Sequence, residues 1–246
     1  MKFSIVIPAL NEAGWIGSTL TAVLAQEYTD FEVIVVNNNS TDDTETIVQQ
    51  FAEQHTRIKI INCPTRGVMN ARNEGYKAAS GDVIVQLDAD TLPAPDWLAK
   101  AEQYLRLHRC VAVVGAYDYY DANPLFRYGA LWAQYVFLFL GNYYAQKRKF
   151  GALMIGGNSF ITKRALDAAG GYDLSHTFYN DDLVVASAVS KIGSVDFYKD
   201  ITVRSSARRY KQAGYFSLQK KYNKGTWAIL LGRPIPRQGE ETIHPR

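Results

Sequence analysis

Two aspartates near the middle of the chain have the type and spacing of a ligand pair for a divalent metal ion. Asp88 and Asp90 come just after residues 83–87, a run that is apolar except for Gln86 and is typical of a buried central strand. A turn beginning at Asp88 brings both carboxylates to the carboxyl edge of a sheet, where open α/β sheets bind ligands. Such hard oxygen donors suit Mg²⁺ or Mn²⁺, and a metal ion shared with a diphosphate needs only one or two protein carboxylates. The pair therefore predicts a metal site at this edge.

Polar side chains also follow three other strand-like segments. They are Pro8, Asn11 and Glu12 after the first segment, Asn37, Asn38 and Asn39 after the second, and Arg66, Arg72 and Asn73 after the third. The asparagine run, together with the N-terminus of the helix after it, is suited to holding a nucleobase and ribose. Helix capping alone would account for Ser40 but not for three consecutive asparagines. Because the carboxyl ends of parallel strands share one edge, these groups predict a single ligand site.

The elements that must position these residues alternate regularly along the chain. Strands are expected at 4–8, 31–37, 58–62, 83–87 and 111–117, and helices at 15–27, 40–52, 68–79 and from the prolines at 93 and 95 to Leu107. Ser40, with Asp43 three residues on, is the expected N-cap of the second helix. Strands that alternate with helices predict an α/β fold with a mainly parallel central sheet.

Length and composition exclude several classes of protein. With 246 residues, of which 47% are hydrophobic, the chain can bury a large core and is not a disordered protein. Only two cysteines, Cys63 and Cys110, are present, which excludes a disulfide framework and a cysteine-ligated zinc site. The N-terminus lacks the features of a secretory signal, so a cytoplasmic location is expected.

Charge is unevenly distributed, although the formal net charge is only +3. Residues 199–246 contain eleven Lys or Arg against three acidic residues, whereas the rest of the chain is net acidic. This basic segment indicates an anionic partner, such as phosphate groups or acidic lipid, or alternatively a solvated helix face. Because no nucleic-acid-binding motif accompanies it, no nucleic-acid partner is expected.

The segment 125–146 is apolar and aromatic, and it lacks any charge from residue 128 to 146. It is too polar, through glutamine, asparagine and tyrosine, to make a good membrane span. Arg127 precedes the uncharged stretch 128–146, and Lys147, Arg148 and Lys149 follow it. This arrangement fits a helix lying on an anionic membrane surface, such as the inner face of the membrane. A buried helix or a contact between two copies of the chain is the alternative.

Seven short motifs, taken in order, resemble glycosyltransferase family 2, whose members have the GT-A fold. They are Ile5–Glu12, Glu32–Asp42, Ala71-Arg72-Asn73, Leu87–Asp90, Gly156-Gly157-Asn158, Gly170–Asp173 and Asn180-Asp181-Asp182. The resemblance covers about residues 1–210. It implies an inverting transfer of a sugar from a nucleotide diphosphate to an acceptor, usually with a divalent metal ion, Mn²⁺ or Mg²⁺.

The resemblance also implies a division of the chain. Residues 1–210 would form one GT-A domain, with a Rossmann-like nucleotide-binding half at 1–117 and an acceptor-binding half at 118–210. Residues 211–246 would be a basic extension that is helical at its start. The implied partners are a nucleotide-sugar donor and a carbohydrate or lipid-linked acceptor, as in the synthesis of cell envelope polysaccharide.

Roles of individual residues follow from the same resemblance. The residues implied to bind the nucleotide are Pro8, Asn11, Glu12, Asn37, Asn39, Arg72, Asn73 and Asp88. The metal ion would be bound by Asp90 together with Asp88. The residues implied to lie near the donor sugar or the acceptor are Gly157, Asn158, Arg208 and Arg209. Asn37 stands where the family most often has the aspartate that recognises uracil, so a UDP-sugar is favoured only modestly. The two arginines are expected to pair with the diphosphate or, alternatively, to be ordinary surface residues.

The acidic pair Asp181 and Asp182 matches the motif in which the second acid is the general base of the family. Asp182 is therefore the expected base, with Asp181 beside it. A sugar nucleotidyltransferase is a second interpretation, but the loop 9–14 lacks the basic residues that would hold a triphosphate. A degenerate member that binds a nucleotide-sugar without turnover is a third, because asparagines stand at 37 and 180.

Overall fold

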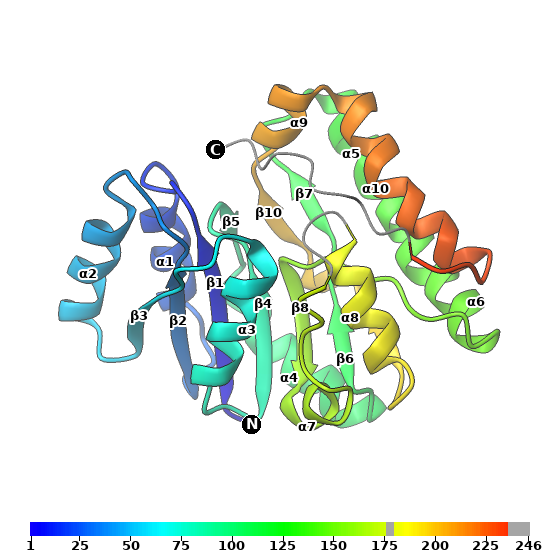
Figure 1. Ribbon diagram of the computed structural model, residues 1–246, viewed down its shortest axis with the longest axis horizontal. Helices are drawn as coiled ribbons and strands as arrows, with labels where there is room; N and C mark the ends of the chain where they lie inside the picture. Colours follow the sequence, from blue (N-terminus) through cyan, green and yellow to red (C-terminus); the bar gives the residue numbers. More distant parts are fainter. Residues whose placement is uncertain (176–179, 236–246) are drawn as a thin grey trace.

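A seven-stranded sheet runs through the centre of the molecule in the computed structural model, which describes residues 1–175 and 180–235 (Figure 1). Its strands are β1 Phe3–Ala9, β2 Phe31–Asn37, β3 Ile58–Asn62, β4 Val83–Leu87, β6 Ala112–Val114, β8 Asn158–Thr162 and β9 Val195–Phe197. Their spatial order is β3-β2-β1-β4-β8-β6-β9. All neighbours are parallel except β8, which runs antiparallel to β4 and β6. The predicted α/β fold with a mainly parallel sheet is confirmed.

Helices cover both faces of this sheet because successive strand residues point to opposite sides. One face carries α1 Ile16–Leu24, α2 Thr44–Gln54 and α4 Trp97–His108, and the other carries α3 Val68–Ala78, α7 Lys163–Ala168 and α8 Asp181–Val189. In β1, for example, Ile5 and Ile7 belong to the first core, and Val6 belongs to the second. This double coverage explains why β4 is buried along its whole length.

A smaller sheet of three short strands lies beyond the carboxyl end of β4. It contains β5 Thr91–Leu92, β10 Val203–Ser205 and β7 Tyr117–Tyr119, in the order β5-β10-β7. The predicted single strand over 111–117 is wrong, because β6 ends at Val114 and β7 belongs to this second sheet. Between the two strands the side chain of Asn158 donates a hydrogen bond to the carbonyl oxygen of Ala116, 3.0 Å away, which takes the place of a strand partner.

The N-terminus of α2 also differs from the expectation. The helix begins at Thr44 and Asp43 occupies the N-cap position, so the assignment of Ser40 as N-cap is wrong. Ser40 instead joins two loops: its hydroxyl accepts a hydrogen bond from the backbone N–H of Asn11 at 3.1 Å, and its own N–H donates to Asn37 Oδ1 at 3.1 Å. The loops after β1 and β2 are thereby held together.

The second half of the chain adds two long helical segments that lie side by side (Figure 1). The first consists of α5 Pro124–Val136, a π-helical turn Phe137–Gly141 and α6 Asn142–Lys147, in agreement with the helix expected over 125–146. After the 3₁₀ turn Lys199–Ile201 and β10, the second consists of α9 Arg208–Ala213 and α10 Tyr215–Leu230. Aromatic contacts join the two segments at both ends, Phe126 with Tyr215 and Phe137 with Trp227. Among the described residues, no helix combines the length and apolar character needed to cross a bilayer.

Candidate active site

A cavity of about 450 Å³ lies between the carboxyl end of β4, the start of α8 and the helices α5 and α10. Its wall combines charged groups with an apolar surface. The charged residues are Arg72, Asp88, Asp90, Asp181, Asp182 and Arg209. A concave site with a few convergent charged groups and apolar walls is the usual setting for small-molecule binding.

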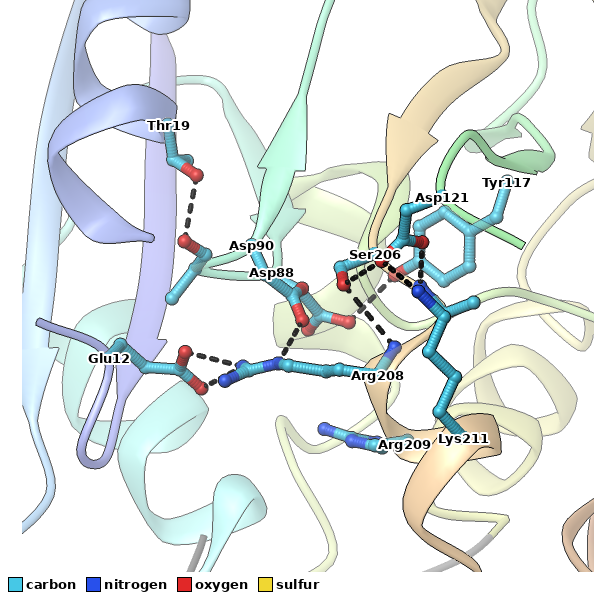
Figure 2. A network of polar contacts seen from close by, with 12 residues as sticks. Glu12, Thr19, Asp88, Asp90, Tyr117, Asp121, Ser206, Arg208, Arg209 and Lys211 are labelled. Carbon is cyan, nitrogen blue, oxygen red and sulfur yellow. Dashed lines mark hydrogen bonds and ion pairs between the residues drawn. The ribbon is translucent and has the colours of Figure 1, made fainter. Parts of the chain in front are cut away.

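The turn after β4 brings both aspartates of the predicted pair to this cavity, as Figure 2 shows. Asp88 Oδ2 accepts a hydrogen bond from the Tyr117 hydroxyl at 2.8 Å, and Asp90 Oδ2 accepts one from Arg208 Nε at 2.8 Å. Between them, the carbonyl oxygen of Ala89 accepts a hydrogen bond from Thr19 on α1 at 2.7 Å. This turn is therefore fixed from three sides, and the two carboxylates are presented at the strand end.

Arg208 joins the first loop of the chain to the Asp88–Asp90 turn (Figure 2). Its guanidinium donates to the carboxylate of Glu12 as well as to Asp90, and it lies over the ring of Trp15 at 5.5 Å. Burial raises the pKa of Glu12 to about 7 and also raises the pKa of Asp90, although the charge of Arg208 opposes both shifts. One cation thus holds two carboxylates that would otherwise repel each other.

Arg72, on α3, is buried and connects the two aspartate pairs of the site. Its Nη1 donates to Asp181 Oδ2 at 2.7 Å, and its Nη2 lies 3.5 Å from Asp88 Oδ1. The chain must approach Asp88 closely at Gly157, since a Cβ there would lie 2.3 Å from the Asp88 carboxyl carbon and 1.9 Å from the Tyr117 hydroxyl. Gly157 is therefore required for its lack of a side chain.

Asp182, the second residue of α8, differs from Asp181 in its electrostatic partners. Its carboxylate accepts hydrogen bonds from the backbone N–H groups of Gly156 at 3.2 Å and of Leu183 at 2.9 Å. No Lys or Arg in the part of the chain that the structure describes forms an ion pair with it. Burial, and then the neighbouring charge of Asp181, raise the pKa of Asp182 to about 7. It can therefore take up a proton near neutral pH.

Two further groups complete the polar wall of the cavity. Arg209 donates a hydrogen bond to the hydroxyl of Tyr222 on α10 at 3.4 Å. Burial alone would lower the pKa of Arg209, but Tyr222 and the nearby aspartates raise this pKa, so Arg209 stays charged. Asn180 Nδ2 is buried and has no hydrogen-bond partner within residues 1–175 and 180–235. The helix α10 packs onto Asn180 at Gly225, where a Cβ would lie 2.0 Å from Asn180 Oδ1.

A known protein family matches most of this chain. The sequence profile described as Glycosyl transferase family 2 matches residues 4–169, which is well over half of the chain. The chain belongs to glycosyl transferase family 2. The matched residues include Arg72 and the Asp88–Asp90 turn of the cavity wall, whereas Asp181, Asp182 and Arg209 lie beyond them.

Curated relatives of this family-2 glycosyltransferase match it over part of their length. An uncharacterized glycosyltransferase of Nostoc sp. is 33% identical over 124 residues, covering 50% of this chain and 38% of the relative. The poly-beta-1,6-N-acetyl-D-glucosamine synthase of Staphylococcus epidermidis is 38% identical over 90 residues, covering 36% of this chain and 22% of the relative. In both cases the matched part is less than two fifths of the relative.

Solved structures share the fold at low sequence identity. The mannosyltransferase PcManGT of Pyrobaculum calidifontis, in complex with GDP-Man and Mn²⁺, superposes with a TM-score of 0.70 at 24% identity, covering 94% of this chain and 68% of that one. TarS residues 1–349 of S. aureus, in complex with UDP, gives a TM-score of 0.67 at 20% identity, covering 84% of this chain and 60% of that one. The GT-A fold expected from the motifs is confirmed.

The residues predicted for the site fall into two groups in this glycosyltransferase. The cavity wall includes Arg72, Asp88, Asp90, Gly157, Asp181, Asp182 and Arg209, and the ion pairs of Arg208 and Glu12 connect these two residues to it. Outside the wall are Pro8, Asn11, Asn37, Asn39, Asn73 and Asn158. Their roles toward a nucleotide or sugar stay predictions.

Asn158, which the resemblance places near the donor sugar or the acceptor, does not line the cavity. It is the first residue of β8 and is fully buried. Its side chain donates to the carbonyl oxygens of Ala116 at 3.0 Å and Ile201 at 2.9 Å and accepts from the Trp97 indole at 3.0 Å. These bonds satisfy the amide inside the core, so Asn158 joins the two sheets instead of facing the cavity.

The three consecutive asparagines after β2 have a structural role that the sequence did not indicate. Asn38 donates to the carbonyl oxygens of Cys63 and Thr65 at 3.0 and 2.8 Å, and Asn39 donates to that of Pro64 at 2.7 Å. Asn37 donates to Glu45 and Asn62 and accepts from Ser40. The run therefore fastens the loop after β2 to the loop after β3. Both Nδ2 hydrogens of Asn37 are used in this way, so a hydrogen bond donated to a nucleobase would have to replace one of them, whereas Oδ1 can accept one more.

Sequence reasoning missed four residues that shape the site: Trp15, Thr19, Asn180 and Tyr222. Trp15 and Thr19 follow the first loop, where an aromatic ring and a buried hydroxyl could have been noted. Tyr222 lies on α10, beyond the part of the chain that the motifs cover, and no pattern connects it to Arg209. Asn180 belongs to a quoted motif, but its buried, unpartnered amide is visible only in three dimensions.

The metal ion expected for the family fits the donor set but needs further ligands from elsewhere. Among the described residues, no cluster of three or more His, Cys, Asp or Glu could hold a metal ion. Asp88 and Asp90 alone would supply two hard carboxylate donors from one turn. Mn²⁺ and Mg²⁺ are commonly bound in this way, with substrate phosphates and water completing the coordination. The residues present are therefore compatible with a metal ion that arrives with a diphosphate.

Proposed function

We propose that this family-2 glycosyltransferase catalyses the inverting transfer of a sugar from a nucleotide diphosphate, with a UDP-sugar favoured, to a hydroxyl of a carbohydrate or lipid-linked acceptor. The observation that supports this most strongly is the contrast between the adjacent aspartates. Asp181 is neutralised by Arg72, whereas the pKa of Asp182 is raised to about 7 and its carboxylate lines the cavity. A general base works best when its pKa lies near the operating pH.

Asp182 is the proposed general base. In the proposed step, its carboxylate takes the proton of the acceptor hydroxyl while the acceptor oxygen forms a bond to the anomeric carbon of the donor. The bond from that carbon to the diphosphate oxygen breaks at the same time, and the nucleotide diphosphate leaves with the electron pair on the opposite side. Asn180, whose buried Nδ2 lacks a partner among the described residues, is placed to donate to a substrate oxygen nearby.

Arg208 and Arg209 are proposed to stabilise the charge of the departing diphosphate. Both are charged and lie on α9, next to the Asp88–Asp90 turn. A divalent cation held by Asp88 and Asp90 would supply further positive charge there when bound. Asp181 is a positioning residue in this scheme, because its ion pair fixes Arg72 between α8 and Asp88.

The proposal is tested by donor binding and donor hydrolysis across a panel of UDP-, GDP- and dTDP-sugars, with Mn²⁺ or with EDTA. We expect one donor class to bind in a metal-dependent manner, and Asp90→Ala to weaken that binding by at least about tenfold. Asp96→Ala is the matched control, since Asp96 is a half-exposed aspartate paired with Lys100 on α4.

Asp182→Asn separates chemistry from binding. The variant should bind the same donor normally while its hydrolysis or transfer rate falls by about 10²–10⁴, the usual contribution of a general base. Failure of the wild-type protein to bind any donor with metal ion present would refute the proposed transfer reaction. Full activity of Asp182→Asn would refute the assignment of the base.

A further inference from the structure

The helix α5 is mostly apolar, yet none of its residues is buried. The large apolar side chains exposed on α5, the π-helical turn and α6 are Leu125, Tyr128, Trp132, Phe139, Leu140, Tyr143 and Tyr144. Leu125 is 87% exposed and Trp132 is 68% exposed. Residues 125, 128, 132, 139 and 143 recur at helical spacing, so they form one stripe along the outside of the segment.

The neighbouring helix α10 carries a second stripe of exposed side chains along its length. Phe216, Lys220, Lys224, Trp227 and Leu231 follow each other at intervals of three or four residues and are all exposed. Phe216 is 93% exposed, and a shallow groove runs from it past the two lysines to Trp227. The exposed apolar side chains of the two stripes together form what we call the two-helix face, with Lys220 and Lys224 within it.

The two helical segments themselves carry charge of one sign. Residues 122–166 and 201–235 contain no Asp or Glu, whereas they contain many Lys and Arg residues. Asp118 and Asp121, which pair with Arg127 and Lys211, lie outside these ranges and are 17% and 22% exposed. Lys147, Arg148 and Lys149 are exposed at the end of α6, beside the end of the first stripe. A surface on which aromatic side chains are mixed with cations and from which anions are absent is complementary to a layer of anionic lipid headgroups.

We propose that the two-helix face docks this glycosyltransferase on an anionic lipid bilayer. Exposed tryptophan and tyrosine side chains prefer the boundary between headgroups and acyl chains, and lysine side chains reach the phosphates there. Contiguous exposed apolar surface of this kind on a soluble domain marks an interaction site. The helices lie in the plane of the membrane surface, since none of the described helices can cross a bilayer.

The cavity adjoins this face directly. Gln219 and Asn223 on α10 line both the cavity and the outer groove, and Gly129, which is exposed on α5, also lines the cavity. A bilayer docked on the two helices would therefore present a lipid headgroup next to the passage that leads to Asp182. Of the two acceptor classes, this selects the lipid-linked one, a conclusion that rests on the proposed function.

Co-sedimentation of the full chain with vesicles tests the docking itself, without donor or acceptor. We expect binding to phosphatidylcholine vesicles that contain phosphatidylglycerol, little binding to phosphatidylcholine alone, and a decrease as salt is added. Lys220→Gln with Lys224→Gln should weaken binding by about fivefold for each lysine. Trp132→Ser should weaken it by about tenfold through the lost insertion of the ring.

Matched substitutions elsewhere on the surface serve as controls. Leu107→Ser on α4 removes an apolar side chain that is 66% exposed, and Lys77→Gln removes a lysine whose side chain is 60% exposed on α3. Neither change should alter vesicle binding. Because every substituted side chain is exposed, all of these variants should fold like the wild type.

Three results would overturn the docking proposal. The first is that the protein does not bind anionic vesicles at low salt. The second is that neither the lysine double substitution nor Trp132→Ser weakens the binding. The third is that the protein binds no vesicles but forms a dimer in sedimentation equilibrium, and that Trp132→Ser dissociates this dimer. The last result would assign the face to a second copy of the chain.

A sugar-transfer assay tests the class of acceptor separately. With a polyprenyl phosphate embedded in the vesicles, we expect the wild type to transfer the sugar to the lipid, and the lysine double variant to lose this transfer while its donor hydrolysis in solution stays unchanged. Transfer to soluble sugars only, by protein that binds the vesicles, would overturn the lipid acceptor and leave docking intact. Loss of donor binding throughout would instead refute the proposed function.

Discussion

Opposite effects on stability are expected from the same substitution at the two adjacent aspartates Asp181 and Asp182. Each change, aspartate to asparagine, removes one negative charge and preserves the shape of the side chain. Asp182 forms no ion pair in the described part of the chain and feels the charge of Arg72 only at a distance, whereas Asp181 holds Arg72 at 2.7 Å. Asp182→Asn should therefore stabilise the fold at neutral pH, and Asp181→Asn should destabilise it.

The magnitude for Asp182 follows from its raised pKa, which lies at about 7 against a reference value of 3.8. Between these two values the folded protein binds a proton that the unfolded chain has released, so the stability of the wild type falls as pH rises through this interval. The full shift corresponds to about 4 kcal/mol, and solvent screening of this half-buried side chain reduces the expected effect to about 2 kcal/mol. Asparagine carries no such penalty, so the advantage of Asp182→Asn grows from pH 5 to pH 8.

The magnitude for Asp181 follows from the burial of its partner. Arg72 has a side-chain exposure of 6%, and removal of its principal anion leaves a buried cation uncompensated. Breaking one member of a buried ion pair usually costs about 3–5 kcal/mol. Asp88, 3.5 Å from Arg72, retains part of the compensation, so a loss of about 3 kcal/mol is expected.

Urea denaturation of the wild type and both variants, followed by circular dichroism at pH 5 and at pH 8, measures these differences in the free energy of unfolding. The reasoning fails if Asp182→Asn is less stable than the wild type at pH 8, because the carboxylate would then be held by a favourable interaction and could not be a poised base. It also fails if the two variants change stability in the same direction.

Three further predictions concern activity and packing. The rate of sugar transfer should rise with pH through about 7 as Asp182 loses its proton, and a pH profile without this limb would contradict its role as base. Arg208→Gln should lower the free energy of unfolding by about 3 kcal/mol at pH 8 and by less at pH 6, because Glu12 and Asp90 can take up protons at the lower pH. Equal losses at both pH values in urea titrations would contradict the dependence of these two carboxylates on Arg208. Gly225→Ala should cost about 1–3 kcal/mol in thermal denaturation, because the added Cβ forces α10 away from α8, and an unchanged melting temperature would show that α10 can move freely.

Apolar periodicity predicted the first part of the fold, up to the end of β4, well. The strands β2, β3 and β4 begin and end at the predicted residues because each is a β-branched run flanked by turn-forming residues. The strands of the second sheet have only two or three residues, which is too short for a periodicity to emerge. Strand β8 was missed because it runs antiparallel among parallel strands and begins within the Gly156-Gly157-Asn158 motif, which was assigned to the site.

The candidate site was predictable where chemistry is local and unpredictable where it depends on distant partners. Asp88, Asp90 and Asp182 were found from short motifs, and all three line the cavity. The ion pairs that set their charge come from far along the chain, as with Arg208 on α9, and sequence spacing contains no information about such pairs. The asparagine run shows the converse, since its members satisfy backbone groups of a neighbouring loop.

The bond between Arg208 and Glu12 also bears on the order in which the protein is completed during synthesis. The two residues are 196 positions apart, so their contact closes almost the whole chain, whereas β1 to β4 pair through contacts within the first ninety residues. Contacts of such separation are slow to form, because loop closure costs entropy before the contact is gained. A nascent chain that has folded only its first half carries Glu12 and Asp90 without the cation that pairs with both. Under the proposed function, we therefore expect the charge balance of the diphosphate site to be completed late, when α9 has been made.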